Sequence, residues 1–310
     1  MIIATTTGDF CDYTAKDDVQ QSVRLLAKCG FKHIDVSLDS AYFKGSKMCS
    51  DEWEKWAEGI LETGRELGVD FVQAHAINSA YAPGEERDYR MDILRRQMRI
   101  CAMLGIPGMV VHAVCRPDGD REDFLKANVQ MYGELLQTAE ETGVHIYTEN
   151  TCTANCPTYF IFDGEDFNEL RERLGRHPLF GCCWDVGHAN VQGVDQYKCI
   201  MDMGDGLMAV HIHDNDGRRD LHLAPYSGGT CYDAIINGLL DVHFKGPFTL
   251  EAFCTPVAQS FYFCRRKHFT QKGPACDRLA MPPLDFKLRS ETLMLDMTRY
   301  MLSSYGCLEE

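Results

Sequence analysis

The feature that most restricts the fold of this chain is a regular alternation of short apolar runs with longer amphipathic segments. Apolar runs of roughly four to eight residues indicate buried strands, and apolar residues recurring every three or four positions indicate helices. In the first half we expect strands at residues 2–7, 31–37, 69–76 and 109–113, and helices near 17–29, 51–67, 88–104 and 121–142. Each of these helices is followed by a glycine, which commonly ends a helix: Gly30, Gly68, Gly105 and Gly143.

The second half of the chain repeats this pattern. Strands are expected at residues 144–149, 181–185, 208–214 and 247–251, with helices near 165–174, 195–203, 231–240 and 290–305. Eight strand–helix units favour a parallel sheet closed into a (β/α)8 TIM barrel. We therefore expect one domain over residues 1–310. It contains a long connection at about residues 254–287, which could act as a lid, an oligomer contact or an anion site.

Composition excludes several classes of protein. The formal net charge of -15 opposes binding to a nucleic-acid backbone, which needs a basic surface.

The chain has 15 cysteines but no Cys-x-x-Cys pair, so we expect reduced, mostly buried thiols. Cys152 and Cys156 lie near the candidate site, either in the wall of a pocket or as packing residues. Without a long apolar run or a signal peptide, a cytoplasmic protein with no membrane contact is expected.

Titratable side chains collect at the carboxyl ends of the predicted strands, where catalytic sites of such barrels lie. A single histidine at a strand end would be weak evidence for a site. Here an acidic or imidazole group stands at the same end of six consecutive strands. The residues, in strand order, are His75, His112, Glu149, Asp185 with His188, His211 with Asp214, and Glu251. Among them, Glu149, Asp185, His211 and Glu251 form a ligand set suited to one divalent ion, such as Mn, Co, Mg or Zn.

This ligand set predicts proton-transfer chemistry on a sugar. The fifth and eighth strands of an eight-stranded ring stand roughly 135° apart, so Glu149 and Glu251 would approach a central ligand from different sides. A metal ion would polarise the sugar carbonyl and stabilise an enediolate. One glutamate could remove a proton while the other returns one, as isomerisation or epimerisation requires. His188 is placed to hydrogen-bond a substrate oxygen.

The strand-end motifs resemble those of a known group of barrels. Glu149-Asn150, Asp185-Val-Gly-His188, His211-Ile-His-Asp214 and Leu250-Glu251-Ala-Phe are similar, in order, to motifs of the xylose isomerase-like sugar phosphate isomerase/epimerase superfamily. Its members include ketose 3-epimerases, hydroxypyruvate isomerase, inosose-processing enzymes and, more distantly, endonuclease IV. The resemblance implies a metal on Glu149, Asp185, His211 and Glu251, with the two glutamates as the acid–base pair. It implies substrate contacts by His188 and Arg218, and we add His75 and His112 as candidates.

Two departures separate the chain from a ketose 3-epimerase. The position six residues beyond the fifth-strand glutamate, a further glutamate in those enzymes, is Asn155 here. The position six residues beyond the metal histidine, their substrate arginine, is Gly217, followed by Arg218 and Arg219. These departures favour isomerisation, dehydration or cleavage of an oxidised sugar over 3-epimerisation of a free ketose.

Three alternatives stay open. An endonuclease IV-like phosphodiesterase with three zinc ions would use His75, His112, His188 and the pair Asp220 and His222 as further ligands. A metal-dependent lyase on a 3-oxo-sugar, similar to a C-glycoside deglycosidase, would use the same metal site together with a partner subunit. A non-catalytic binding barrel is disfavoured by the complete ligand set. We rank first a metal-dependent sugar isomerase or epimerase that forms a homo-oligomer and binds a small sugar or sugar derivative.

Overall fold

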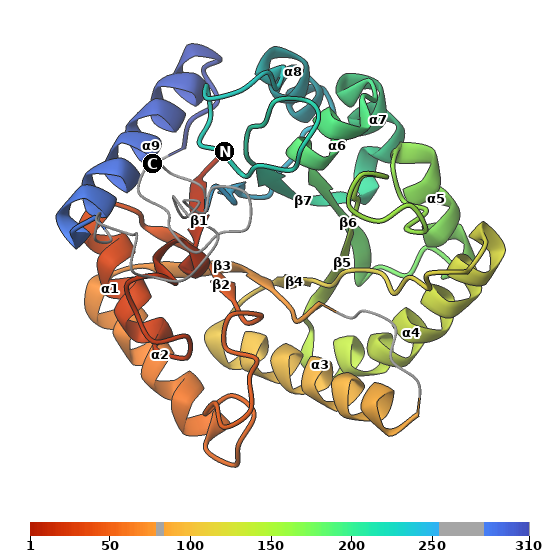
Figure 1. Ribbon diagram of the computed structural model, residues 1–310, viewed down its shortest axis with the longest axis horizontal. Helices are drawn as coiled ribbons and strands as arrows, with labels where there is room; N and C mark the ends of the chain where they lie inside the picture. Colours follow the sequence, from red (N-terminus) through yellow and green to blue (C-terminus); the bar gives the residue numbers. More distant parts are fainter. Residues whose placement is uncertain (79–83, 254–281, 310) are drawn as a thin grey trace, which may run out of the picture.

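The computed structural model describes residues 1–78, 84–253 and 282–309, and its centre is a closed barrel of parallel strands. Each strand pairs with the next along the chain, and the last pairs with the first. Figure 1 looks down this ring, with the helices arranged around the outside. The expected (β/α)8 barrel is confirmed. Its strands are β1 (Ile3–Thr6), β2 (His33–Ser37), β3 (Asp70–His75), β4 (Gly108–Val110), β5 (His145–Glu149), β6 (Phe180–Asp185), β7 (Leu207–Ile212) and β8 (Phe248–Leu250).

The helices follow the strands along the chain, with two differences from the sequence-based expectation. A short additional helix begins directly after β6, and the last helix begins at Leu284, not at Ser290. Residues 254–281 of the long connection expected after the eighth strand lie outside the described residues. The α-helices are α1 (Val19–Cys29), α2 (Trp53–Leu67), α3 (Glu85–Leu104), α4 (Arg121–Thr142), α5 (Gly164–Arg173), α6 (Val186–Gln192), α7 (Gln196–Met203), α8 (Tyr232–Asp241) and α9 (Leu284–Ser304).

Aspartates begin several of these helices. A side-chain oxygen at the N-cap satisfies a backbone N–H that has no partner within the helix. Asp18 accepts from the N–H of Gln21 at 3.1 Å, and Asp120, Asp163 and Asp195 play the same role for α4, α5 and α7. At the other end of α1, Gly30 adopts a φ of 100°, a left-handed conformation that costs glycine little. These signals explain why the predicted helix ends lie close to the observed ones.

The interior of the barrel is layered, and this layering positions the site. A small core of Val110, Tyr147, Cys183 and Ala209 fills the barrel. Side chains along a strand alternate between the two faces, so the residues two positions further along β5, β6 and β7 also point inward. Those residues are Glu149, Asp185 and His211. The polar site therefore lies directly above an apolar layer.

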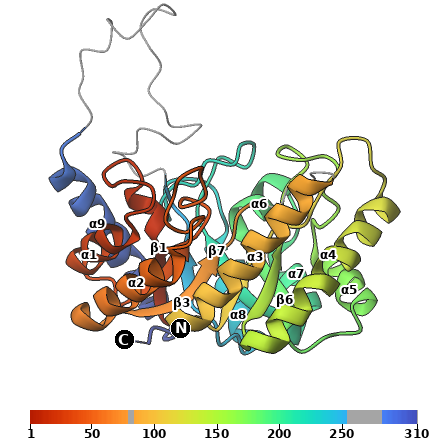
Figure 2. The same ribbon diagram turned by 90° about the horizontal axis from the view of Figure 1, so that it is seen from below.

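The two chain ends lie close together at the end of the barrel opposite the polar site (Figure 2). The backbone N–H of Glu309 donates to the carbonyl of Met1 at 2.9 Å, and the Met1 ammonium lies 3.1 Å from the Glu309 carboxylate. Among the described residues, none of the helices combines the length and apolarity needed to cross a membrane.

Candidate functional site

Four side chains from four consecutive strands converge at the carboxyl end of the barrel. They are contributed by the ends of β5 and β6, the interior of β7 and the residue after β8, and one ligand atom of each lies within 4.8 Å of those of the others. All four are buried. We call them the carboxylate cluster: Glu149, Asp185, His211 and Glu251.

His211 lies between the two glutamates. Its Nδ1 is 3.0 Å from Oε1 of Glu149 and 3.4 Å from Oε2 of Glu251. The ring is held from the other side by Gln73, whose amide nitrogen lies 2.9 Å from Nε2 and also donates to Oδ2 of Asp35 at 3.0 Å. Nδ1 is therefore the nitrogen that faces the centre of the cluster.

Asp185 is held in two ways: Asn150 binds its backbone, and its carboxylate caps the start of α6. The side chain of Asn150 accepts from the Asp185 N–H at 2.7 Å and donates to the Asp185 carbonyl at 2.9 Å, which ties the end of β5 to the end of β6. The Asp185 carboxylate accepts from the N–H of His188 at 2.6 Å and is the N-cap of α6. The short helix thus presents His188 beside the cluster.

The residues of the carboxylate cluster fit a divalent cation. Burial alone would raise the pKa of Glu149, but His211 and His112 hold it well below its usual range. Glu149 is 1% exposed, and within the described chain its Oε2 accepts no hydrogen bond. An anionic oxygen buried without a hydrogen bond is costly unless a cation is nearby. Together with the oxygen and nitrogen donors around it, this atom is suited to Mn, Co, Mg or Zn.

Two histidines approach the same oxygen of Glu149. Nε2 of His75 lies 3.6 Å from Oε2 and Nε2 of His112 lies 3.3 Å from it, and these two ring nitrogens are 3.1 Å apart. Burial lowers the pKa of His112. Burial would also lower the pKa of His75, but the nearby carboxylates of Glu149 and Glu251 raise it to about 9. The two expected strand-end histidines therefore lie beside Glu149, where their ring nitrogens are further possible ligands for a cation.

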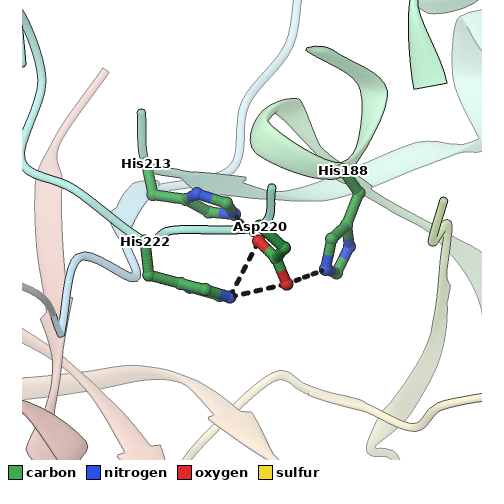
Figure 3. Close-up of side chains that lie close together, drawn as sticks. All are labelled: His188, His213, Asp220 and His222. Atoms are coloured by element: carbon green, nitrogen blue, oxygen red, sulfur yellow. Dashed lines mark hydrogen bonds and ion pairs between the residues drawn. The ribbon is translucent and has the colours of Figure 1, made fainter. Parts of the chain in front are cut away.

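A further cluster lies beside the first and is shown in Figure 3. The carboxylate of Asp220 stands between two rings, with Oδ2 3.2 Å from Nε2 of His188 and 3.2 Å from Nε2 of His222. The ring of His213 stacks on that of His222, with a centroid distance of 3.9 Å and an angle of 15° between the planes. We call this group the histidine cluster: His188, His213, Asp220 and His222.

The charged residues of the histidine cluster shift one another's pKa values. Burial would raise the pKa of Asp220, but His222 and His188 hold it far below its usual range. Burial would lower the pKa of His222, yet Asp220 raises it to about 9. Asp185 and Asp220 likewise raise the pKa of His188 well above its usual value, against the effect of burial. The cluster can hold either protons or a cation between its rings.

The loops after β5 and β7 place the remaining sequence-predicted residues. Asn155, where a ketose 3-epimerase would have a glutamate, donates to Oδ2 of Asp220 at 2.9 Å. Asp214 accepts from the backbone N–H groups of Asn215, Gly228 and Thr230 and so shapes the β7–α8 loop. Arg218 is exposed on that loop, and within the described part of the chain its side chain makes no contact with either cluster.

Sequence reasoning missed several members of this site. His213 lies in a quoted motif but was assigned no role, although its Nε2 contacts Asp185. Asn150 was noted only as the neighbour of Glu149. Asp220 and His222 were considered only for the three-zinc alternative. An Asp-x-His pair shortly after a predicted barrel strand was the signal that could have placed them, because both residue types are metal ligands.

A family model described as a xylose isomerase-like TIM barrel matches residues 23–268. The uncharacterized protein y4fM of Sinorhizobium fredii is 24% identical over 280 residues, which cover 80% of this chain and 86% of that protein. The probable endonuclease 4 of Citrifermentans bemidjiense is 27% identical over 198 residues, which cover 60% of this chain and 69% of that endonuclease.

Among solved structures, D-psicose 3-epimerase from Clostridium cellulolyticum H10 with D-tagatose is similar, with a TM-score of 0.73 and 14% identity. The superposition covers 97% of this chain and 99% of the epimerase. At this identity, the similarity shows a shared fold.

Proposed function

The chain belongs to the xylose isomerase-like TIM barrel family, and from this premise we propose that it is a divalent-metal-dependent enzyme that isomerises or epimerises a sugar. The observation that carries the proposal is the approach of two glutamates from different strands to one nitrogen of His211. Sugar isomerisation and epimerisation need two groups that can exchange protons with carbon, and two carboxylates on opposite sides of a substrate meet this need.

The carboxylate cluster would hold the metal ion through Glu149, Asp185, His211 and Glu251. When bound, a divalent ion supplies Lewis acidity that polarises a carbonyl oxygen and makes the neighbouring C–H more acidic. Gln73 and Asn150 would keep the ring of His211 and the backbone of Asp185 in position, as groups around metal ligands commonly do.

The two glutamates would divide the proton transfers. Glu149 is almost fully enclosed, whereas 12% of the Glu251 side chain is exposed. A carboxylate with access to water can exchange its proton with solvent, so Glu251 is suited to bring solvent hydrogen to the substrate. Glu149 would act on the other face, in a site that excludes water. This division follows from exposure alone, and either glutamate can start the reaction.

The histidine cluster would recognise substrate oxygens. Because Asp220 contacts Nε2 of both His188 and His222, it orients two rings toward the same side of the site. Charged histidines donate strong hydrogen bonds to hydroxyl and carbonyl oxygens. The Nδ1 atoms of His188 and His222 contact backbone carbonyls, so a substrate oxygen would share the Nε2 donors with Asp220. His75 and His112, beside Glu149, would contribute further contacts, and Arg218 is the candidate to reach an outer substituent of the substrate.

Solvent-hydrogen exchange tests this proposal without knowledge of the substrate. Protein loaded with one divalent ion would be incubated in D2O with a panel of ketoses and aldoses, and deuterium would be located by NMR. We expect deuterium at a carbon next to the carbonyl of at least one sugar, together with an isomer or epimer of it. Absence of exchange with every sugar by the metal-loaded protein would reject proton-transfer chemistry on the panel.

A second candidate function is hydrolysis of a phosphodiester. It is favoured by one observation, namely that His75 and His112 meet Glu149 while His188, Asp220 and His222 form a separate group next to the carboxylate cluster. These groups could hold three ions, and two or more metals commonly serve phosphoryl chemistry. The net charge of -15 opposes a polynucleotide substrate. Cleavage of bis(p-nitrophenyl) phosphate by protein carrying three zinc ions, without deuterium exchange into sugars, would favour this alternative.

A further inference from the structure

Two cysteines from neighbouring loops meet at the rim of the site. Cys115 lies on the β4–α4 loop, three residues beyond His112, and Cys156 lies on the β5–α5 loop, next to Asn155. Their Sγ atoms are 3.1 Å apart, about 1 Å longer than a disulfide bond. Both thiols are free, and both residues are only partly buried, so a dissolved reagent can reach them.

The approach of the two sulfurs is imposed by the backbone around them. The side chain of Asn128, on α4, accepts from the N–H of Val114 at 2.8 Å and donates to its carbonyl at 2.9 Å, which holds the residue before Cys115. On the other loop, the N–H of Cys156 donates to the carbonyl of Cys152 at 3.1 Å. The thiols are therefore brought together by the fold of the two loops, and little movement is needed to join them.

A buried tyrosine supports the same arrangement. The hydroxyl of Tyr159 accepts from the N–H of Ala113 at 2.9 Å and donates to the carbonyl of Glu149 at 2.8 Å. It joins the chain just before Cys115 to the end of β5. The two loops thus stay in register whether or not a covalent bond forms between them.

We propose that Cys115 and Cys156 form a reversible disulfide that links the β4–α4 and β5–α5 loops. The oxidant is a small-molecule disulfide such as oxidised glutathione. The thiolate of one cysteine attacks it, forms a mixed disulfide and releases one glutathione thiolate. The second cysteine then attacks the protein sulfur of that mixed disulfide, loses its proton to water and releases the second glutathione. Two protein thiols are oxidised and one oxidised glutathione is reduced to two thiols.

Burial, together with the neighbouring Cys156 thiol, raises the pKa of Cys115 to about 12. Cys115 therefore keeps its proton in the reduced protein. Whichever of the two cysteines enters the mixed disulfide, the other lies beside it and resolves it.

The link would join two parts of the candidate site. The chain before Cys115 carries His112, which lies beside Glu149, and the residue before Cys156 is Asn155, which donates to Asp220. A covalent bond between the loops would fix these two contacts relative to each other. The pair is therefore a modification site that responds to the thiol–disulfide state of the surroundings.

Peptide mapping tests the proposal on the full, metal-loaded chain. The protein would be equilibrated in glutathione buffers of increasing oxidised fraction, its remaining thiols alkylated, and its peptides identified by mass spectrometry. We expect a peptide pair joined through Cys115 and Cys156, with loss of two alkylatable thiols, and full reversal by dithiothreitol. If the two cysteines instead carry separate glutathione groups, or stay alkylatable while exposed Cys11 and Cys231 react, the proposal is overturned.

Single substitutions provide the controls. In Cys115→Ser, Cys156 should stop at the mixed disulfide with glutathione, because no resolving thiol is adjacent. Cys231→Ser removes an exposed thiol elsewhere on the chain and should leave the Cys115–Cys156 link unchanged. Formation of an internal disulfide by Cys156 in the Cys115→Ser variant would contradict the assigned pairing.

Discussion

His213 donates through one nitrogen to both carboxylate oxygens of Asp185, with Nε2 3.0 Å from Oδ1 and 3.1 Å from Oδ2. His213 also stacks on His222, so it connects the carboxylate cluster to the histidine cluster. The ring has room for this because residue 187 is glycine. A Cβ built at Gly187 would lie only 1.8 Å from Cε1 of His213.

Gly187→Ala should therefore push His213 away from Asp185. We expect a loss of about 1–3 kcal/mol in the free energy of unfolding, as for other overpacked interiors. Groups that orient metal ligands typically contribute about 10–100-fold to metal affinity, so metal binding should weaken by a similar factor. Urea unfolding and metal titration would measure both effects.

Gly133→Ala is the matched control for that substitution. Gly133 lies within α4, and a Cβ there would meet nothing within 4 Å. The change should leave metal affinity unaltered and stabilise the helix by about 0.5–1 kcal/mol. Equal metal affinity in Gly187→Ala and the wild-type protein would show that the contact between His213 and Asp185 does not support the cluster.

The barrel and its carboxylate cluster could be anticipated because both depend on short-range periodicity. Alternation along a strand places Tyr147 and Glu149 on the same face, so an apolar run that ends in Glu149 predicts a polar site above an apolar layer. The same argument applies to Cys183 with Asp185. Helix ends were predictable where Asp caps and glycine determine them locally.

The remaining features depend on contacts between distant residues or on short segments. Helix α6 has seven residues, too few to show a helical period, so the sequence predicted no helix between the sixth strand and residue 195. His213 is next to a predicted strand end, but no sequence pattern shows that its ring reaches Asp185 on another strand. The approach of Cys115 to Cys156, 41 residues apart, likewise depends on how two loops pack.

Glu149→Gln and Glu251→Gln should each abolish deuterium exchange while leaving a folded chain. An amide cannot accept a proton from carbon, and general acid–base groups typically contribute about 100–10,000-fold to rate. Glu172→Gln is a suitable control, since Glu172 is exposed on α5 and pairs with Arg176. Exchange by either active-site variant at the wild-type rate would exclude that glutamate from the acid–base pair.

His188→Ala should mainly weaken use of the substrate. Loss of a charged hydrogen bond to a substrate oxygen is worth about 1.5–3 kcal/mol, which corresponds to roughly 10–100-fold in the exchange rate at low substrate concentration. Metal content should stay the same. His177 lies before β6 and contacts Glu140. His177→Ala should therefore change neither the exchange rate nor the metal content. If His188→Ala loses a metal ion, the histidine cluster is itself a metal site.

Asp35 should make the metal-free protein less stable as pH rises. Burial raises its pKa from 3.8 to about 6, so the folded state holds the proton more tightly than the unfolded state. Asp35 should therefore contribute a fall of about 3 kcal/mol in the free energy of unfolding between about pH 4 and 6. Asp35→Asn cannot ionise and should lack this contribution, whereas exposed Asp39→Asn should keep it. An unchanged slope in Asp35→Asn, measured by urea unfolding, would contradict this assignment.

The metal content of protein purified without chelator shows whether the carboxylate cluster is a metal site. We expect one tightly bound divalent ion per chain, which His211→Ala loses and His222→Ala retains. That result would place the ion in the carboxylate cluster, between the two glutamates. A chain that binds no divalent ion, or a His211→Ala variant that keeps it, would rule out the carboxylate cluster as the metal site. Three zinc ions in the wild-type chain, with one lost in His222→Ala, would replace sugar isomerisation with phosphodiester hydrolysis.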